Sequence, residues 1–209
     1  MGNNFNNPWL SVWVRPRKTV RAFLDSAEPE KGMIPIAMLS GIINALNRAS
    51  VRNLGDDTGL LSIFVVAILG GAFFGIIGLY LGSAIIKITG GWIGGQGEYS
   101  ELRAAFTRGI NVPTVLIGTL WVPELLLFGA DMFTSEMPSL AGSPVLYAIY
   151  CFFILLELVF GVWGFIISMK SIGEAHRFSA VKAFWSVLIP GGILLGILVV
   201  FMLFLSVAL

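Results

Sequence analysis

The sequence predicts an all-α membrane protein: a bundle of five transmembrane helices preceded by an amphipathic helix in the membrane plane. Two observations lead to this fold class. Only 12% of the 209 residues are charged, 56% are hydrophobic and the mean hydropathy is +0.88, whereas soluble domains usually carry about 25% charged residues. The apolar residues also gather in runs near the length of about 20 residues that a spanning helix needs. We therefore expect lipid to surround most of the chain.

Four of the runs are long and almost free of charge. Residues 60–86 and 183–209 contain no charged side chain, and two further runs contain one glutamate each, Glu124 and Glu157. A helix rises about 1.5 Å per residue, so each run is long enough to cross about 30 Å of hydrocarbon. The predicted spans are 60–88, 110–130, 145–169 and 183–209.

The first predicted span, 33–51, has a shorter apolar run than the other four. It holds Pro35 near its start and Asn44 and Arg48 further on. It is long enough to cross the membrane only if Asn47 and Arg48 reach the interface, as a long Arg side chain can. A re-entrant or interfacial hairpin is the alternative, and the span is favoured because it makes the charge pattern consistent.

The basic residues indicate the orientation of the helices, because cytoplasmic segments collect Lys and Arg. With the N-terminus inside, only Arg48 and Arg52 fall outside. The inside segments then hold Arg15, Arg17, Lys18, Arg21, Lys31, Lys87, Arg103, Arg108, Lys170, Arg177 and Lys182. We expect a multi-pass protein of the inner or plasma membrane, with a cytoplasmic N-terminus and an extracytoplasmic C-terminus.

We expect two parts: a cytoplasmic segment, 1–25, and a transmembrane domain, 26–209. The segment begins with an Asn-rich tip, predicted to be disordered, and continues as PWLSVWVRPRKTVRAFLD, predicted to be one in-plane helix with Pro16 in a first turn. Its aromatic and basic residues suit a surface for anionic lipid or a protein partner, or a plain membrane anchor. They are Trp9, Trp13, Arg17 and Arg21.

The polar residues inside the spans are the candidate site. Charge at bilayer depth is costly, so Glu124 and Glu157 should face the bundle interior with partners. Asn44 and Arg48 lie at a similar predicted depth, and we expect one of them to pair with Glu124. The glutamates then either join helices structurally or form an ion or proton site.

Small residues and prolines also mark the spans. Glycines spaced 4, 3 and 4 apart share one side of the second span and permit close helix packing, within the chain or in a homo-oligomer. These are Gly71, Gly75, Gly78 and Gly82. Prolines remove backbone donors and predict kinks. They are Pro113, Pro123 and Pro190.

The remaining motifs argue against enzyme chemistry. Cys151 and His176 are each the only residue of their type, so no metal site of the usual kind and no cofactor are expected. The segment TGGWIGGQG lacks the Lys and Ser/Thr of a phosphate loop and predicts a flexible turn. His176 is expected to form hydrogen bonds on the cytoplasmic side. The near-zero net charge gives no indication of nucleic-acid binding.

Three stretches carry a resemblance: PWLSVWVRPRKTVRAFLD, GEYSELRAAFTRGINVPTVL and IGEAHRFSAVKAFWSVLIP. In order and placement the chain resembles the bacterial branch of the Yip (Ypt-interacting protein) domain family. The resemblance implies a five-helix bundle and a cytoplasmic N-terminus. Eukaryotic members act in vesicle traffic through Rab-type GTPases, but the Asp-Leu-Tyr-Gly-Pro element is missing here and Tyr99 and Ser100 match the Tyr-Gly-Tyr-Ser element only in part. We therefore do not transfer the GTPase role.

Two functions follow from the sequence. The first is a non-enzymatic scaffold or adaptor that oligomerises through its Gly-rich helices and binds a cytoplasmic protein partner. Its docking residues would be Trp9, Trp13, Arg17, Arg21, Tyr99 and His176. The alternative is a small ion or proton-coupled transporter or channel that uses Glu124 and Glu157. The lipid bilayer is a partner in both cases.

Overall fold

The structure, a computed structural model, describes the backbone of residues 7–208 and the side chains of residues 7–205. The described residues form helices and turns without any strand, and they include five helical segments long and apolar enough to cross a membrane. These are Met33–Val51, Leu60–Trp92, Tyr99–Phe133, Pro144–Ala175 and Ala180–Leu205. The predicted all-α class with five candidate membrane spans is thus confirmed. The predicted disorder of the Asn-rich tip concerns residues outside the described range.

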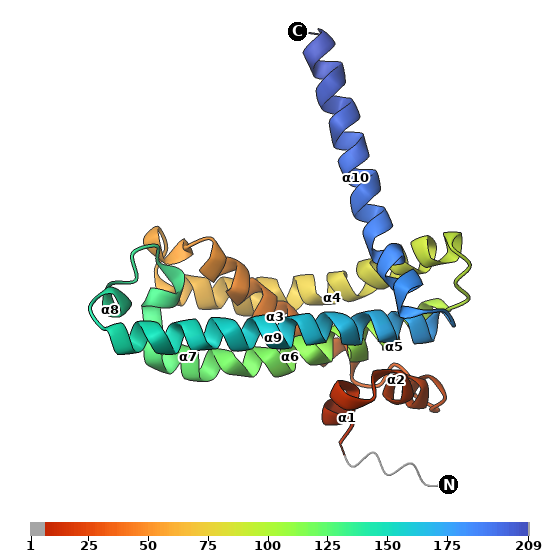
Figure 1. Cartoon of the computed structure of the whole chain (residues 1–209), viewed down its shortest axis with the longest axis horizontal. Helices are drawn as coiled ribbons and strands as arrows, with labels where there is room; N and C mark the ends of the chain where they lie inside the picture. The colour runs from red at the N-terminus through yellow and green to blue at the C-terminus, as the bar shows by residue number, and fades with distance from the viewer. Residues whose placement is uncertain (1–6, 209) are drawn as a thin grey trace.

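Helices α3 (Met33–Val51) and α4 (Leu60–Trp92) form the closest pair of the bundle (Figure 1). A Cβ added to Gly41 would lie 2.1 Å from the Gly71 carbonyl oxygen, and one added to Gly75 would lie 2.2 Å from the Ala37 carbonyl oxygen. The backbones touch here, which is possible only between small residues. The continuous α3 also fits a full span rather than a hairpin.

The third span is not one regular helix. It runs through α5 (Tyr99–Phe106), the π-helical turn η2 (Thr107–Asn111), α6 (Val112–Ile117), the 3₁₀ turn η3 (Gly118–Leu120), α7 (Trp121–Phe128) and the 3₁₀ turn η4 (Gly129–Phe133). The π turn ends at Asn111, shortly before Pro113, and the first 3₁₀ turn ends at Leu120, shortly before Pro123. Each proline lacks the N–H that would bond to the carbonyl four residues earlier, so the preceding turn departs from α geometry.

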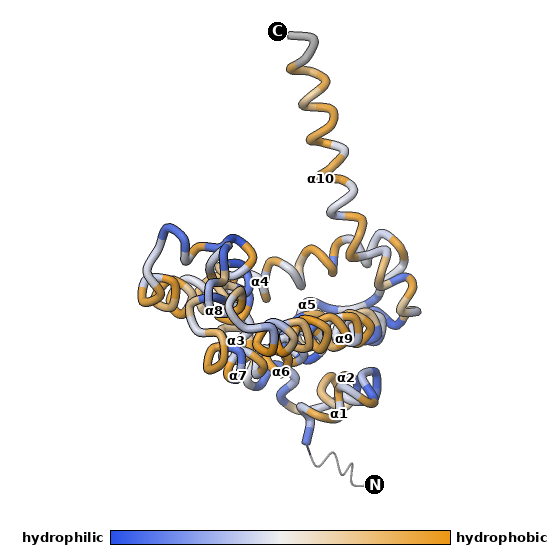
Figure 2. Tube along the Cα trace, turned by 60° about the vertical axis from the view of Figure 1, so that its left-hand side comes forward, coloured by the Kyte–Doolittle hydropathy of each residue, from blue (hydrophilic) through white to orange (hydrophobic). Residues whose placement is uncertain are grey.

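The last two helices are α9 (Pro144–Ala175) and α10 (Ala180–Ala208), joined at His176–Ser179. The first turns of α10 pack against α4 and α9, where the Thr89 hydroxyl donates to the Ser186 carbonyl oxygen at 2.7 Å. Beyond this contact α10 leaves the other helices, and its apolar surface extends away from the bundle (Figures 1 and 2). The helix continues through Pro190.

The N-terminal segment contains two helices, α1 (Pro8–Val14) and α2 (Pro16–Leu24), so the prediction of one continuous helix is wrong. The break lies at Arg15, because the residue before a proline is driven out of the α conformation. Pro16 opens α2, as predicted. Both helices lie against α9, and they bury Val12 and Val20.

The opposite end of the bundle is closed by the 3₁₀ turn η1 (Leu54–Asp56), η4 and the short helix α8 (Pro138–Ala141). The Ser50 hydroxyl donates to the Met132 carbonyl oxygen at 2.6 Å, which ties the end of α3 to this cap. The buried Asp131 carboxylate accepts the Ser139 backbone N–H at 2.7 Å and so holds the start of α8.

Candidate functional site

The two intramembrane glutamates line a single cavity of about 430 Å³. Glu124 comes from α7 and Glu157 from α9, so the carboxylates approach the space from different helices. Polar groups of α3, α6 and α9 share its wall. They are Asn44, Asn47, Ser50, Thr114 and Tyr150.

The orientation of Glu124 is set by its own helix. Trp121, Glu124 and Phe128 follow one another at i, i+3 and i+7, so they share the buried face of α7. Trp121 stacks on Phe133 with ring centroids 5.6 Å apart, and Phe128 packs edge-on against Tyr150 at 5.4 Å. These aromatic contacts turn Glu124 toward the bundle, where only 3% of it is exposed.

Neither carboxylate is neutralised by a neighbour. Among the described residues, no hydrogen bond or ion pair involves Glu124 or Glu157. The predicted pairing of Glu124 with Arg48 or Asn44 is therefore wrong. The Asn44 amide instead donates to the Ser40 carbonyl oxygen at 2.9 Å.

The reason lies in the helical positions on α3. Arg48 lines a neighbouring cavity of about 390 Å³ together with Gly78 and Asn111, whereas Asn44 lines both cavities. Asn47, one position before Arg48 and therefore about 100° around the helix, faces the glutamate cavity instead. Its Oδ1 accepts the Trp121 indole N–H at 2.7 Å.

The cavity extends far along the helices. On α3 it spans Ile43 to Val51 and on α9 it spans Tyr150 to Gly161, which correspond to about 12 Å and about 16 Å of helix. That is about half of a 30 Å hydrocarbon layer. Carboxylate and amide oxygens are suited to hard cations and to protons. No group of three or more His, Cys, Asp or Glu side chains for a metal ion occurs within the described part of the chain.

Most of the predicted docking residues lie at the end of the bundle that carries α1 and α2. Several of them form contacts with other residues of the same chain. The Glu174 carboxylate on α9 accepts Arg17 Nη1 at 3.1 Å and Arg21 Nε at 2.8 Å. The Trp163 indole N–H donates to the Trp13 carbonyl oxygen at 3.0 Å. Trp9 and Trp13 are partly buried against a small apolar cluster that includes Val12 of α1 and Ile167 of α9. These contacts attach α1 and α2 to α9.

Two further ion pairs lie in this region. Arg177 pairs with Glu101 at 2.8 Å, and Arg103 pairs with Glu30. They join α5 to the turn between α9 and α10 and to the segment before α3. The sequence offered no signal for these pairs, since the partners lie more than 70 positions apart.

His176 is fully buried, so its side chain cannot contact a docking partner. Its Nδ1 accepts the Gly97 N–H at 3.4 Å and its Nε2 lies 3.1 Å from the Ile86 carbonyl oxygen. A Cβ at Gly90 or Gly95 would lie within 2.4 Å of the ring. The glycine-rich segment therefore wraps the imidazole, and burial lowers the His176 pKa below its ordinary value.

Tyr99 is the one predicted docking residue of this end whose side chain is largely free, with 47% exposed. The Lys87 ammonium lies 5.8 Å from the centre of its ring. Whether this face binds a partner remains a prediction.

These features define the class of the protein: a polytopic α-helical membrane protein whose apolar helices contact lipid. The family follows from comparison with known proteins. A family model described as the Yip1 domain matches residues 10–202, and the chain therefore belongs to the Yip1 domain family. A search of curated proteins and a search of solved structures each gave no match.

Proposed function

We propose that this Yip1-domain protein binds a cation or a proton at Glu124 and Glu157 and moves it across the membrane. The observation that supports the proposal is the position of both carboxylates on one intramembrane cavity without a hydrogen bond or ion pair among the described residues. A purely structural role would require a hydrogen bond or ion pair that joins two helices, and neither glutamate side chain makes one among the described residues. A bound positive charge would offset the cost of placing carboxylates at this depth.

The cavity suggests a route. It runs from the end of α3 at Val51 to about the middle of the span at Thr114 and Gly161. Passage further along requires movement of the third span, where the π turn at Thr107–Asn111 and Pro113 interrupt regular helix bonding. Interrupted helices line substrate sites in many transporters. We assign the glutamates to binding and this interruption to gating.

The test is flux in proteoliposomes. Purified full-length protein is reconstituted, and the uptake of H⁺, Na⁺ and K⁺ is followed with ion-sensitive dyes. We expect flux of one of these ions, reduced about tenfold or more by Glu157→Gln and by Glu124→Gln, because the amide keeps the shape but removes the charge. Glu136→Gln is the matched control, since Glu136 is exposed and does not line the cavity. Absence of flux for all three ions, or equal flux in all variants, would refute the transport role.

A second candidate is the non-enzymatic scaffold that oligomerises through its helices. One observation favours it: every residue of α10 from 191 to 205 is exposed. A second copy could cover this apolar surface. Leu198→Cys in a Cys151→Ser background should then crosslink at the size of a dimer under oxidation, and a monomer at all oxidant levels would count against it.

The glycine residues and the N-terminal segment bear on this scaffold differently. Gly71 and Gly75 contact α3 of the same chain. A Cβ added to Gly78 would meet no atom within 4 Å, so Gly78 is the glycine available for contact between two copies. A cytoplasmic partner that docks on the N-terminal segment would contact its exposed residues, such as Leu10 and Val14 of α1. Deletion of residues 1–25 should abolish recovery of such a partner in a pull-down while leaving membrane insertion intact.

The orientation is part of the proposal. We place the N-terminus in the cytoplasm and the C-terminus outside the inner or plasma membrane, which follows from the basic residues near one end of the spans. Reporter fusions at the two termini should report opposite sides of the membrane. Fusions on the same side would contradict this orientation.

A further inference from the structure

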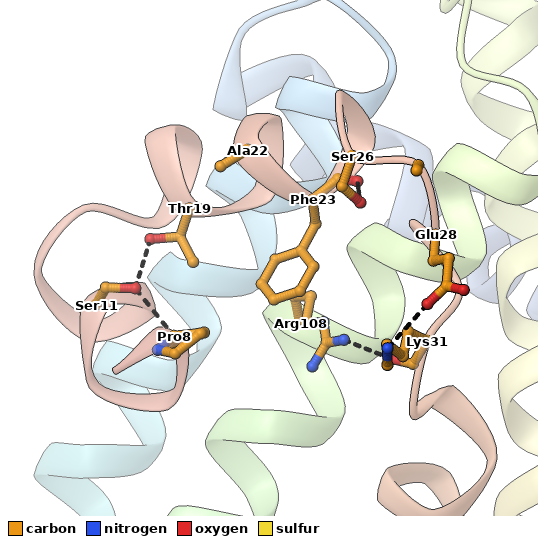
Figure 3. Close-up of a pocket in the computed structure, with 10 residues that line it drawn as sticks. Pro8, Ser11, Thr19, Ala22, Phe23, Ser26, Glu28, Lys31 and Arg108 are labelled. Atoms are coloured by element: carbon orange, nitrogen blue, oxygen red, sulfur yellow. Dashed lines mark hydrogen bonds and ion pairs between the residues drawn. The ribbon is translucent and has the colours of Figure 1, made fainter. Parts of the chain in front are cut away.

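We infer that a cavity beneath the two N-terminal helices binds the phosphate head group of an anionic membrane lipid through Arg108. The cavity is an open pocket of about 460 Å³ between α1, α2, the segment before α3 and the π turn of the third span (Figure 3). It is separate from the glutamate cavity, with which it shares no lining residue.

Arg108 carries a buried positive charge without a carboxylate partner. Only 8% of the residue is exposed, and no ion pair among the described residues includes it. One Nη donates to the Lys31 carbonyl oxygen at 2.6 Å, and the guanidinium lies 3.8 Å from the centre of the Phe23 ring. Its buried Nε has no hydrogen-bond partner. Buried charges are normally paired, so an anion is the missing component.

The other charged groups of the cavity do not supply that anion. Glu28 and Lys31 both line it, but they pair with each other at 2.9 Å. Figure 3 shows this pair on one side of Arg108 and Phe23 above its guanidinium. The lining as a whole is therefore left with the positive charge of Arg108, which matches a monoanionic phosphate diester and the planar donor geometry of Arg.

The rest of the lining favours a lipid over a soluble phosphate. Phe23, Ala22 and Ala27 provide apolar wall. On the opposite side the Thr19 hydroxyl donates to the Ser11 hydroxyl at 3.1 Å, and both residues line the space. The walls come from helices that lie beside a membrane span, where a lipid can place its head group on Arg108 and its glycerol and first acyl carbons on the apolar wall.

The test is lipid binding to delipidated, full-length protein in detergent, measured by native mass spectrometry and by the shift in melting temperature. We expect one phosphatidylglycerol to bind and raise the melting temperature. Phosphatidylcholine, which carries no net charge, should bind at least about tenfold more weakly. Inorganic phosphate alone should give no shift in melting temperature. Arg108→Gln should weaken phosphatidylglycerol binding about tenfold or more.

Two variants keep the test decisive if Arg108→Gln fails to fold. Ala22→Trp fills the cavity and leaves Arg108 in place, so it should abolish the lipid shift. Lys18→Gln is the matched control, because it removes an exposed positive charge from the same helix without touching the cavity. Wild-type lipid binding in Ala22→Trp, equal binding of phosphatidylcholine, or an equal shift with inorganic phosphate would overturn the inference.

Discussion

Replacing Gly41 with alanine should destabilise the protein, although alanine is the better helix former by about 0.5–1 kcal/mol. The new methyl carbon would lie 2.1 Å from the Gly71 carbonyl oxygen and 2.6 Å from the Gly75 Cα. Carbon–oxygen contacts normally lie at about 3.3–3.6 Å, and both obstacles are backbone atoms that no rotamer change can move. Helices α3 and α4 must therefore separate by about 1 Å.

The energetic cost follows from this separation. In lipid, helix association depends on close van der Waals packing, which a 1 Å gap weakens along the whole contact. Overpacking typically costs about 1–3 kcal/mol. We expect a net loss of about 1–2 kcal/mol in the free energy of unfolding for Gly41→Ala, after the gain in helix propensity is subtracted.

Gly78→Ala is the matched comparison on the facing helix. An added Cβ at Gly78 meets no atom within 4 Å, so we expect unchanged stability or a gain of up to about 1 kcal/mol. Both variants can be unfolded with increasing SDS in mixed micelles and followed by circular dichroism. Equal stability of the two variants, or a more stable Gly41→Ala, would refute the close packing described here.

Two further predictions concern His176 and Glu174, which lie at the C-terminal end of α9. Burial lowers the His176 pKa, so the unfolded chain binds a proton at a higher pH than the folded chain does, and stability should fall as the pH falls through the ordinary pKa of about 6.5. Between about pH 7.5 and pH 5.5 we expect a loss of up to about 1.4 kcal/mol, which His176→Gln removes; a wild-type protein with no such loss would contradict the burial of a neutral ring. Glu174→Gln should accelerate amide hydrogen exchange in α1 and α2, measured by mass spectrometry, while α3 and α4 stay protected. The cost should be at most about 1 kcal/mol for each arginine contact, since both guanidinium groups are partly exposed, and unaltered exchange in α1 and α2 would count against this attachment.

The spans could be predicted because composition alone determines which segments lipid will accept. The glycine spacing in the second span also predicted a small-residue side, and the structure places Gly71 and Gly75 against α3. The irregular turns before Pro113 and Pro123 followed from the missing backbone donors.

The candidate site was only half predictable. The sequence indicated that Glu124 and Glu157 lie at bilayer depth, but depth along a helix does not give the direction in which a side chain points. A rotation of about 100° separates Asn47, which lines the glutamate cavity, from Arg48, which does not. The sharing of one cavity by the two glutamates therefore required the packing of α3, α7 and α9.

The attachment of the N-terminal helices was also hidden from the sequence. Arg17 and Arg21 suggested a surface for lipid or a partner, yet their partner Glu174 lies more than 150 positions away. Arg108 appeared as one more cytoplasmic charge, and only the fold shows that it is buried beneath Phe23.

The most direct test of the carboxylate cavity is labelling with a hydrophobic carbodiimide, which reacts with protonated carboxyl groups inside membranes. Peptide mass spectrometry of the treated full-length protein should find Glu124 or Glu157 modified and the exposed Glu136 unmodified. Labelling should fall when the pH rises or when the bound cation is added in excess. Absence of labelling at both glutamates, or labelling that neither pH nor any tested cation changes, would contradict a cation or proton site in this protein.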